Sequence, residues 1–479
     1  MTDDLCMMTA TEMLRLFRVR KLSPVEVTRA VLERIDRHDR KVAAFRLVAP
    51  EQAMKAARQS EKRWKNGAPQ GLLDGVPTTI KDQWLTRGWS TLRGSTLSPT
   101  RGKWDEDSPP VARLREHGAV LLGKTTMPEF GWKGVTDCTL TGISRNPWNT
   151  DKTCGGSSGG AAIAAAAGFG ALHLGSDGAG SIRMPAGFCG VFGLKGTFGR
   201  VPSHPYATLP MCSHVGPIAR TVADGALMYN VMTEPDARDW LAPPYDARDW
   251  RVGLEDGVRG LRIAYSRTLG YAKVDRELGQ LVDKAVKVLA DLGAIVEERD
   301  PGFSDPFEPF YAHYAGAMMV NLEKLGPKAR EELDPGFVRM AEDGKRYSAK
   351  DMLLAWDARH NLGRHMNVFH QTYDVLITPQ MSLVAFDAGR EFPAGRGMKS
   401  WFDWSPFCFP FNFTQQPAAT VPCGLTRDGL PAALQVVTAR YREDLAFRVA
   451  RAYESACPFA MPGVSRLGKG GAKKREKVR

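Results

Sequence analysis

Two glycine- and serine-rich turns on either side of an alanine-rich segment constrain this chain more than any other feature of its sequence. Residues 155–160 read GGSSGG, and residues 175–181 read GSDGAGS. Between the turns, residues 161–174 are mostly alanine and glycine and fall short of the roughly 20 apolar residues that span a bilayer. We expect an interior helix here, followed by a short strand that ends in the second turn.

Helices and strands alternate along much of the chain. Ser23 begins a capping box with proline at the next position, which predicts a helix start, and residues 44–65 and 111–117 also have helical patterns. Short apolar strands are predicted at residues 78–80 and 119–123. The same alternation resumes in the C-terminal half, so the sequence predicts a layered α/β core.

Chain length and composition leave the number of domains open. The 479 residues are enough for one large core or for two to three ordinary domains. Hydrophobic residues at 43% and charged residues at 25% are typical of a folded globular protein. A Pro-, Asp- and Trp-rich stretch at residues 234–260 is a candidate boundary between two lobes, which one sheet can still unite. We expect one domain over residues 1–468.

Much of the net charge of +12 lies at the C-terminus. Residues 469–479 hold six Lys or Arg and one Glu, a net +5, which leaves +7 for the rest of the chain. This segment has no apolar periodicity, so we expect a disordered, solubilising basic tail. We do not expect it to mark a nucleic-acid-binding protein, because no RNA-binding motif accompanies it.

The N-terminus and the cysteines favour a cytoplasmic protein. The chain opens with acidic residues and lacks a positive leader and an apolar signal core, so secretion is not expected. The eight cysteines contain no C-x-x-C pair, and no Cys/His cluster has zinc-ligand spacing. We expect reduced, mostly buried thiols, no metal ion, no cofactor and no membrane association.

The second turn has the composition of an oxyanion hole. Glycines let the backbone approach a ligand closely, so the N–H groups of Gly178, Ala179, Gly180 and Ser181 are candidates to converge on one oxygen. Ser181 is the candidate nucleophile, but neither turn contains a histidine to take its proton. Lys81 ends a predicted apolar strand, where burial would lower its pKa, and Ser–Lys pairs are a known variant of the catalytic triad.

These residues resemble the amidase signature family. The two turns match its signature, and residues 75–82 match its lysine segment. Further matching segments lie at residues 123–131, 146–149, 193–195, 411–414 and 421–424. The resemblance therefore covers nearly the whole chain and rests on specific motifs.

The resemblance implies one large α/β domain with a central mixed β-sheet covered by helices. It also implies a Ser–Ser–Lys triad in which Ser181 attacks an amide carbonyl, Ser157 relays the proton and neutral Lys81 is the final base. The roles then reverse to protonate the leaving amine.

The same resemblance assigns supporting roles around the triad. It implies a cis peptide bond between Gly156 and Ser157, a geometry that is rare outside proline. Asp177 and Arg183 are implied as a structural pair that orients the second turn, with Ser158 as further structural support. None of these three is expected to react with substrate.

Two positions depart from the family pattern. Ala179 stands where glycine is common, and it keeps an N–H that can still donate provided that its φ is negative. Gly196 replaces the proline that is usual after residues 193–195, a change that we expect to alter only the stiffness of the loop. Neither departure removes a reacting atom.

Two other interpretations fit some of the same residues. Residues 155–159 also match G-x-S-x-G, the nucleophile elbow of α/β-hydrolases, which would make Ser157 the nucleophile; residues 147–152 are predicted as loop, whereas the elbow needs a strand there. Asp82 is a candidate ion-pair partner for Lys81, but neighbouring strand residues point to opposite faces.

Aromatic residues suggest where an apolar substrate would bind. Met127, Phe130 and Trp132 are candidates for a pocket wall, although core packing is favoured. A later aromatic segment either fills the core or closes over an apolar acyl group, and it comprises Trp401, Phe402, Trp404, Phe407, Phe409, Phe411 and Phe413.

The sequence thus predicts an amidohydrolase that cleaves the C–N bond of a small-molecule carboxamide through an acyl-enzyme on Ser181, releasing a carboxylate and ammonia or an amine. The identity of the amide and the cleavage of esters stay open. The alternative within the family is the glutaminase subunit of a tRNA-dependent amidotransferase. A catalytically idle protein whose basic tail binds nucleic acid is disfavoured by the intact triad, and a homodimer is the default oligomer.

Overall fold

The central sheet draws strands from almost the whole length of the chain. The computed structural model describes residues 2–206, 209 and 211–462, so the predicted tail at residues 469–479 lies outside the described residues. The strands of the central sheet are β1 (Phe45–Val48), β2 (Pro77–Lys81), β3 (Val120–Thr125), β8 (Leu172–Asp177), β9 (Phe192–Lys195), β10 (His214–Ala219), β11 (Arg262–Tyr265), β12 (Ile295–Glu298), β13 (Val375–Pro379), β14 (Ala418–Leu425) and β15 (Pro431–Thr438).

Two short ribbons and the helices surround this sheet. The ribbons pair β4 (Asp137–Cys138) with β5 (Gly142–Ile143), and β6 (Arg145–Asn146) with β7 (Asn149–Thr153). The α-helices are α1 (Thr2–Met7), α2 (Ala10–Arg18), α3 (Pro24–Val42), α4 (Pro50–Lys65), α5 (Pro109–Glu116), α6 (Gly159–Ala167), α7 (Arg183–Cys189), α8 (Val222–Met232), α9 (Arg276–Asp291), α10 (Phe307–Leu325), α11 (Ala329–Glu332), α12 (Pro335–Asp343), α13 (Ala349–Thr372), α14 (Phe409–Phe413) and α15 (Glu443–Ala456). Short 3₁₀ helices are η1 (Glu129–Gly131), η2 (Gly344–Arg346) and η3 (Trp401–Trp404).

The sheet is mixed, as predicted. Its 11 strands follow the order β1-β3-β2-β8-β10-β9-β14-β15-β13-β11-β12. Parallel pairs occur near both ends, β3 with β2 and β2 with β8 at one end and β13 with β11 and β11 with β12 at the other. The strands on the two sides of residues 234–260, β10 and β11, belong to this same sheet. The predicted α/β fold is confirmed, and the lobe boundary stays a prediction.

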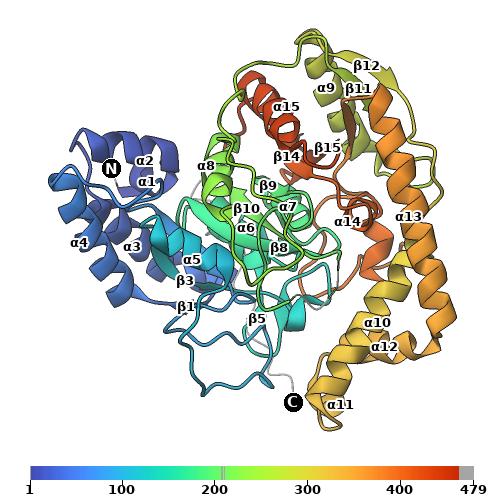
Figure 1. Cartoon of the computed structure of the whole chain (residues 1–479), viewed down its shortest axis with the longest axis horizontal. Coiled ribbons are helices and arrows are strands. Elements are labelled where there is room, and N and C mark those ends of the chain that lie inside the picture. Colours follow the sequence, from blue (N-terminus) through green and yellow to red (C-terminus); the bar gives the residue numbers. More distant parts are fainter. Residues whose placement is uncertain (1, 207–208, 210, 463–479) are drawn as a thin grey trace.

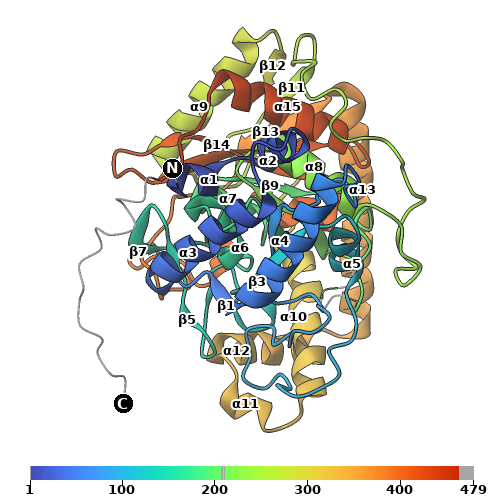
Figure 2. The ribbon, with the colours of Figure 1, turned by 90° about the vertical axis from the view of Figure 1, so that its left-hand side faces the viewer.

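Helices cover both faces of the sheet. Helices α6 and α7 pack together on one face of the central strands, and α8, α9 and α15 cover the other face. Helix α4 lies against β3 beside α3, at the end of the sheet that faces the viewer in Figure 2. Helices α10, α12 and α13 form a separate helical layer at the right of Figure 1. Of the helices in the described residues, none combines the length and the apolar character that crossing a membrane requires.

The alanine-rich segment is the interior helix that its sequence predicts. Every residue of α6 is buried, and the helix contacts β2, β3, β8 and β10. Alanine and glycine side chains are small, so the helix axis can lie close to the strands beneath it. Helix α6 therefore fixes the two glycine–serine turns, one at its start and one beyond the strand that follows it.

Two predicted elements differ in the structure. The helix expected from residue 44 begins only at Pro50, because Phe45–Val48 instead form β1, which pairs antiparallel with β3 at the edge of the sheet. Residues expected as loop before the first turn include the strand Asn149–Thr153, which pairs with β6 in a ribbon outside the central sheet. In both cases the strand partner lies far along the chain or across a tight turn, and local pattern does not reveal it.

The aromatic segment fills the core. All seven aromatic side chains between residues 401 and 413 are buried, in a cluster that joins α10, α12 and η3. The rings of Trp401 and Phe402 stack with centroids 3.7 Å apart, and Phe402 also contacts Phe310 and Tyr314 of α10. Such ring pairs add to the free energy of burial. The segment thus attaches the helical layer to the sheet.

Candidate active site

Sheet topology places the two predicted reaction centres at one edge. Strand β2 ends at Lys81 and runs parallel to β8, which ends at Asp177, with Ile80 opposite Leu174. Because parallel neighbours end on the same side of a sheet, Lys81 and the turn after Asp177 lie together. The first turn joins them: the N–H of Ser158 donates to the carbonyl of Ser181 over 3.0 Å.

Lys81 is fully buried among hydroxyl groups. Its Nζ lies 2.7 Å from Ser157 Oγ, 3.0 Å from Ser158 Oγ and 2.9 Å from Ser176 Oγ. Burial lowers the pKa of the Lys81 ammonium to about 7, against the opposing attraction of Asp177. A neutral amine is therefore accessible near neutral pH.

The direction of the hydrogen bonds singles out Ser157. The hydroxyl of Ser158 donates to the Ser176 carbonyl over 3.0 Å, and the hydroxyl of Ser176 donates to Gln83 Oε1 over 2.6 Å. Both hydroxyls therefore act only as acceptors toward Lys81. A neutral amine has two N–H groups, which these serines accept, and one lone pair, which is left to accept the proton of Ser157.

Asp82 does not pair with Lys81. Its carboxylate lies on the other side of the strand end, where Arg46 Nη2 donates to it over 2.9 Å and the Lys124 ammonium lies 3.8 Å away. This is the alternation of side chains that neighbouring positions in a strand require. The predicted separation of Asp82 from Lys81 is confirmed.

Two other buried lysines have different surroundings. Lys124 donates to the carbonyl of Trp84 and to two threonine hydroxyls, at positions 86 and 91, that themselves donate to the same carbonyl. Lys195 donates to the carbonyls of Gly196 and Gln416. Burial lowers the pKa of both, but every neighbouring oxygen accepts from the amine, so neither lysine faces a hydroxyl proton.

The second turn presents Ser181 to a cavity. Ser181 is 7% exposed and lines the cavity with Ser157. Gly180 before it has φ +116°, and a Cβ there would lie 2.6 Å from the Cβ of Cys408. A side chain at this position would therefore push the second turn away from Cys408, which directly precedes α14.

Asp177 and Arg183 form a buried pair beneath the turn. The Arg183 guanidinium donates from Nε and Nη2 to the two carboxylate oxygens of Asp177, each over 3.0 Å. Burial opposes ionisation of Asp177, but Arg183 outweighs it and holds the pKa of the carboxyl below its usual range. Asn412 donates to the carbonyl of Asp177 over 2.9 Å, which links the turn to α14.

Backbone N–H groups in the turn divide into two sets. The N–H of Gly180 donates to Asp177 Oδ1 over 2.7 Å, and so holds the turn rather than facing the cavity. Among the described residues, the N–H groups of Gly178, Ala179 and Ser181 have no hydrogen-bond acceptor. Ala179 is not one of the positive-φ residues, which meets the condition stated for its role as a donor.

The cavity is small, and only part of its lining is apolar. Its volume is about 40 Å³, room for water but not for a substrate of many atoms. Phe130, Leu209, Tyr314 and Met318 form its apolar side, opposite the serines and Gly178. None of its described lining residues carries a charged side chain or an imidazole.

The peptide bond before Ser157 is cis, as the resemblance implies. The strand before this turn belongs to a two-stranded ribbon, whereas a nucleophile elbow follows a strand of the central sheet. With no histidine among the described lining residues either, the geometry does not support the elbow.

Gly196 has a packing role that loop stiffness does not describe. A Cβ at this position would lie 2.0 Å from the hydroxyl oxygen of Tyr229. That hydroxyl donates to Glu443 Oε1 over 3.2 Å, so it cannot turn away without losing a buried partner. A residue with a side chain at position 196 would therefore clash with Tyr229. This corrects the expectation that the change from proline to Gly196 alters only the stiffness of the loop.

Several residues at the site were not predicted. Ser176 accepts from Lys81 and donates to Gln83, and Gly131 lies against Ser157. Tyr314 and Met318 come from α10, far along the chain. Ser176 belongs to the second glycine–serine turn, and Gln83 lies two positions after Lys81, so both were within reach of the strand pattern. Of the three candidates for a pocket wall, Met127 and Trp132 are buried, and Phe130 lines the cavity.

Fold and family together define the class of protein. A family model described as Amidase matches residues 26–446. The chain belongs to the amidase signature family, and the protein is an amide-hydrolysing enzyme.

Known proteins of the family are similar over nearly their whole length. An acylamidase of Rhodococcus erythropolis is 34% identical over 96% of this chain and 97% of its own. A glutamyl-tRNA(Gln) amidotransferase subunit of Moorella thermoacetica is 32% identical over 95% and 98%. The crystal structure of a bacterial aryl acylamidase of the amidase signature family superposes with a TM-score of 0.89 and 30% identity, covering 97% of this chain and 99% of that one.

Proposed function

We propose that Lys81, Ser157 and Ser181 are the catalytic triad of this amidase. The observation that carries the proposal is the set of hydrogen bonds around Lys81, in which only the hydroxyl of Ser157 has its proton free to reach the lone pair of the amine. A base of pKa about 7 suits proton transfer at neutral pH. Ser157 is thus a relay between the buried base and Ser181.

The reaction follows from these positions. As Ser181 Oγ attacks the amide carbonyl, its proton passes to Ser157 while the proton of Ser157 passes to Lys81. The oxyanion forms next to the N–H groups of Gly178, Ala179 and Ser181. The C–N bond then breaks, and Lys81 returns its proton through Ser157 to the leaving nitrogen. Water repeats the attack on the acyl-enzyme and releases a carboxylate.

We further propose an amide with an apolar acyl or aryl group as substrate. The support is the cavity wall of Phe130, Leu209, Tyr314 and Met318, which offers apolar contact and no charged side chain among the described residues. Free glutamine carries an ammonium and a carboxylate, and burying both without charged partners is costly. Two acylamidases among the similar proteins point the same way.

The second candidate is the glutaminase subunit of a tRNA-dependent amidotransferase, favoured by similarity to the Moorella thermoacetica protein. Such a glutaminase would co-purify with partner subunits when expressed from its own operon or genome. Purification of the native protein, followed by assays with glutamine and with N-acyl aryl amides, separates the two candidates.

The triad is tested by labelling with a fluorophosphonate and measuring intact mass. The wild-type chain is expected to gain one label, Ser181→Ala none, and Lys81→Ala and Ser157→Ala a label at a much lower rate. Ser213→Ala is the matched control, because Ser213 lines the same cavity without contacting Lys81. Labelling that survives Ser181→Ala would overturn the nucleophile, and an unchanged rate in Lys81→Ala would overturn the base.

A further inference from the structure

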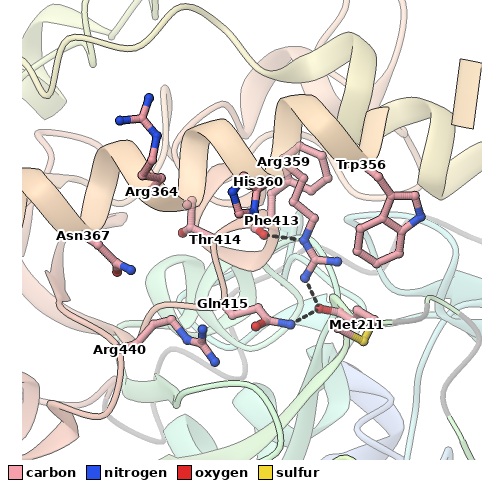
Figure 3. Close-up of a pocket in the computed structure, with 11 residues that line it drawn as sticks. Met211, Trp356, Arg359, His360, Arg364, Asn367, Phe413, Thr414, Gln415 and Arg440 are labelled. Carbon is pink, nitrogen blue, oxygen red and sulfur yellow. Dashed lines mark hydrogen bonds between the residues drawn. The ribbon is translucent and has the colours of Figure 1, made fainter. Parts of the chain in front are cut away.

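A second and much larger cavity lies beside α13. Its volume is about 520 Å³, within the range of small-molecule sites and far above the 40 Å³ of the catalytic cavity. Helix α13 forms one wall, and the chain just after α14 forms another (Figure 3). We call this cavity the arginine pocket, after Arg359, Arg364 and Arg440 in its lining. It shares no described lining residue with the catalytic cavity.

The lining is positively charged and uncompensated. Besides the three arginines it includes His360, and no Asp or Glu is among its described residues. In the described part of the chain, none of these arginines forms an ion pair with a carboxylate. Arginine residues clustered without counter-charges repel one another, so an anion between them would be stabilising.

Arg359 is the most deeply placed of the three. It is only 7% exposed, yet its Nε donates to the Phe413 carbonyl and its Nη2 to the Met211 carbonyl, both over 2.8 Å (Figure 3). Both acceptors are neutral. A nearly buried guanidinium whose acceptors are neutral receives no counter-charge from them, so an anion at its remaining N–H groups would be strongly stabilising.

Arg440 supplies a second unpartnered donor from the opposite wall. It follows β15 and lies on the side of α13 to which Arg359 points, whereas Arg364 points to the other side of that helix (Figure 3). Its Nη2 donates to the Tyr441 hydroxyl over 2.9 Å, but its buried Nε has no hydrogen-bond partner among the described residues. Buried N–H groups without a partner cost free energy, and a ligand oxygen would satisfy this one.

The remaining lining is apolar. The Arg359 guanidinium lies 4.9 Å from the ring centroid of Trp356 and 5.7 Å from that of Phe413. Trp356 is 40% exposed although it is a large aromatic residue, and Met211 also lines the pocket. These rings offer a surface on which a flat apolar group can lie between solvent and the arginines.

We propose that the arginine pocket binds an organic anion, a carboxylate attached to an apolar or aromatic body. The carboxylate contacts Arg440 and the free edge of Arg359, Arg364 adds a nearby positive charge at the rim, and the apolar body covers Trp356 and Phe413. Nothing in this assignment depends on the triad, so the site stands or falls apart from the catalytic proposal.

Binding is tested by isothermal titration calorimetry of the full chain with sodium phenylacetate. Gly363 lines the pocket within α13, and a Cβ there meets nothing within 4 Å, so Gly363→Leu fills the pocket without disturbing the helix. Arg364→Glu reverses one charge on an exposed side chain. Asn361→Leu and Lys350→Glu are the matched controls, since both positions lie on α13 outside the lining.

We expect one phenylacetate to bind per chain. Its affinity is expected to fall at least about tenfold in Gly363→Leu and in Arg364→Glu, and to stay within about twofold of the wild type in both controls. Affinity is also expected to fall as salt rises. Equal affinity in all five proteins would place the anion elsewhere and overturn the proposal. If 2-phenylethanol bound as tightly as phenylacetate, the arginines would not determine the affinity. If inorganic phosphate bound as tightly as phenylacetate, the apolar body of the ligand would not contribute to binding.

Discussion

Among single residues, the hydrogen-bond partners of Lys81, rather than its burial, distinguish it from the other buried lysines. Lys81, Lys124 and Lys195 are all completely buried, and burial lowers the pKa of each. Only Lys81 has a neighbouring hydroxyl whose proton is not already donated elsewhere. The function of a buried amine therefore depends on whether the oxygens around it need a donor or an acceptor.

The pH dependence of the reaction follows from the neutral base. With Lys81 as the proposed base, an amine of pKa about 7 that must be unprotonated, kcat/KM is expected to rise tenfold per pH unit below this value and to level off above it. Initial rates with an N-acyl aryl amide between pH 5 and pH 9 measure the profile. An activity that falls with increasing pH across this range would contradict a neutral lysine.

Ser176 is expected to be a positioning residue for the base. Ser176→Ala removes one acceptor of the Lys81 amine, so kcat is expected to fall roughly tenfold. The lost acceptor also stabilised the ammonium, so the inflection of the pH profile is expected to move to lower pH. Ser213→Ala, which changes a serine in the same cavity, should leave the inflection in place. An unchanged inflection in Ser176→Ala would remove Ser176 from the mechanism.

Among the elements, the parallel pair of β2 and β8 brings the site together, and the Asp177–Arg183 pair holds the turn that follows β8. The Asp177–Arg183 ion pair is fully buried and links β8 to α7. Asn412 contacts both members and links the ion pair to α14. Removing one member leaves an uncompensated charge in the core.

Arg183→Met is therefore expected to cost about 3 to 5 kcal/mol of unfolding free energy. Arg330→Met is the matched control, because the Arg330–Glu342 pair has the same chemistry but both side chains are more than a third exposed, at 40% and 37%. Its expected cost is about 0 to 1 kcal/mol. Urea unfolding followed by circular dichroism measures both, and similar costs would contradict a structural role for the buried pair.

A second prediction at this scale concerns the loop after β9. Gly196→Ala places a methyl group against the Tyr229 hydroxyl and is expected to destabilise the fold by about 1 to 3 kcal/mol. Tyr229→Phe removes the obstructing oxygen, so the double variant is expected to be more stable than the sum of the two single effects predicts. Additive effects in the urea experiment would show that the clash with Tyr229 is not the cause.

In the molecule as a whole, one continuous sheet joins the two ends of the chain, and the active site lies where early strands meet the later helical layer. The proposed catalytic residues come from β2 and the turns around α6, and part of the cavity wall comes from α10. The homodimer and the cytoplasmic location stay predictions, which light scattering on the purified protein and cell fractionation would check.

Global stability should reflect the cost of keeping Lys81 neutral. Its folded pKa of about 7 lies below the value near 10.4 of an unfolded lysine, so between these values only the unfolded chain holds the proton. This contribution makes stability rise with pH over that window and is most unfavourable below pH 7. Lys81→Met removes it, so its gain over the wild type should be larger at pH 6 than at pH 9 by roughly 3 kcal/mol. A gain independent of pH would contradict the shifted pKa.

Local signals in the chain were sufficient for the α/β class, the buried α6 and the candidates Ser181 and Lys81, whereas Ser157 and the complete triad came from the resemblance to the amidase signature family. These signals are apolar periodicity, glycine turns and the absence of a histidine beside Ser181. The predicted Lys81, Ser157 and Ser181 meet at one edge because β2 and β8 are neighbours, and the cis bond at Ser157 is where the motif placed it.

Only packing between distant segments showed which oxygens accept and which donate hydrogen bonds around Lys81. The same holds for β1, which replaces the first turn of an expected helix, and for Gly196, which makes room for Tyr229. Such packing was also needed to show that the Gly180 N–H holds Asp177 and that α13 and the chain after β15 bring three arginines to one pocket. Each of these depends on contacts between residues distant in the chain, and the direction of a hydrogen bond or the space for a side chain exists only once those distant partners are packed together.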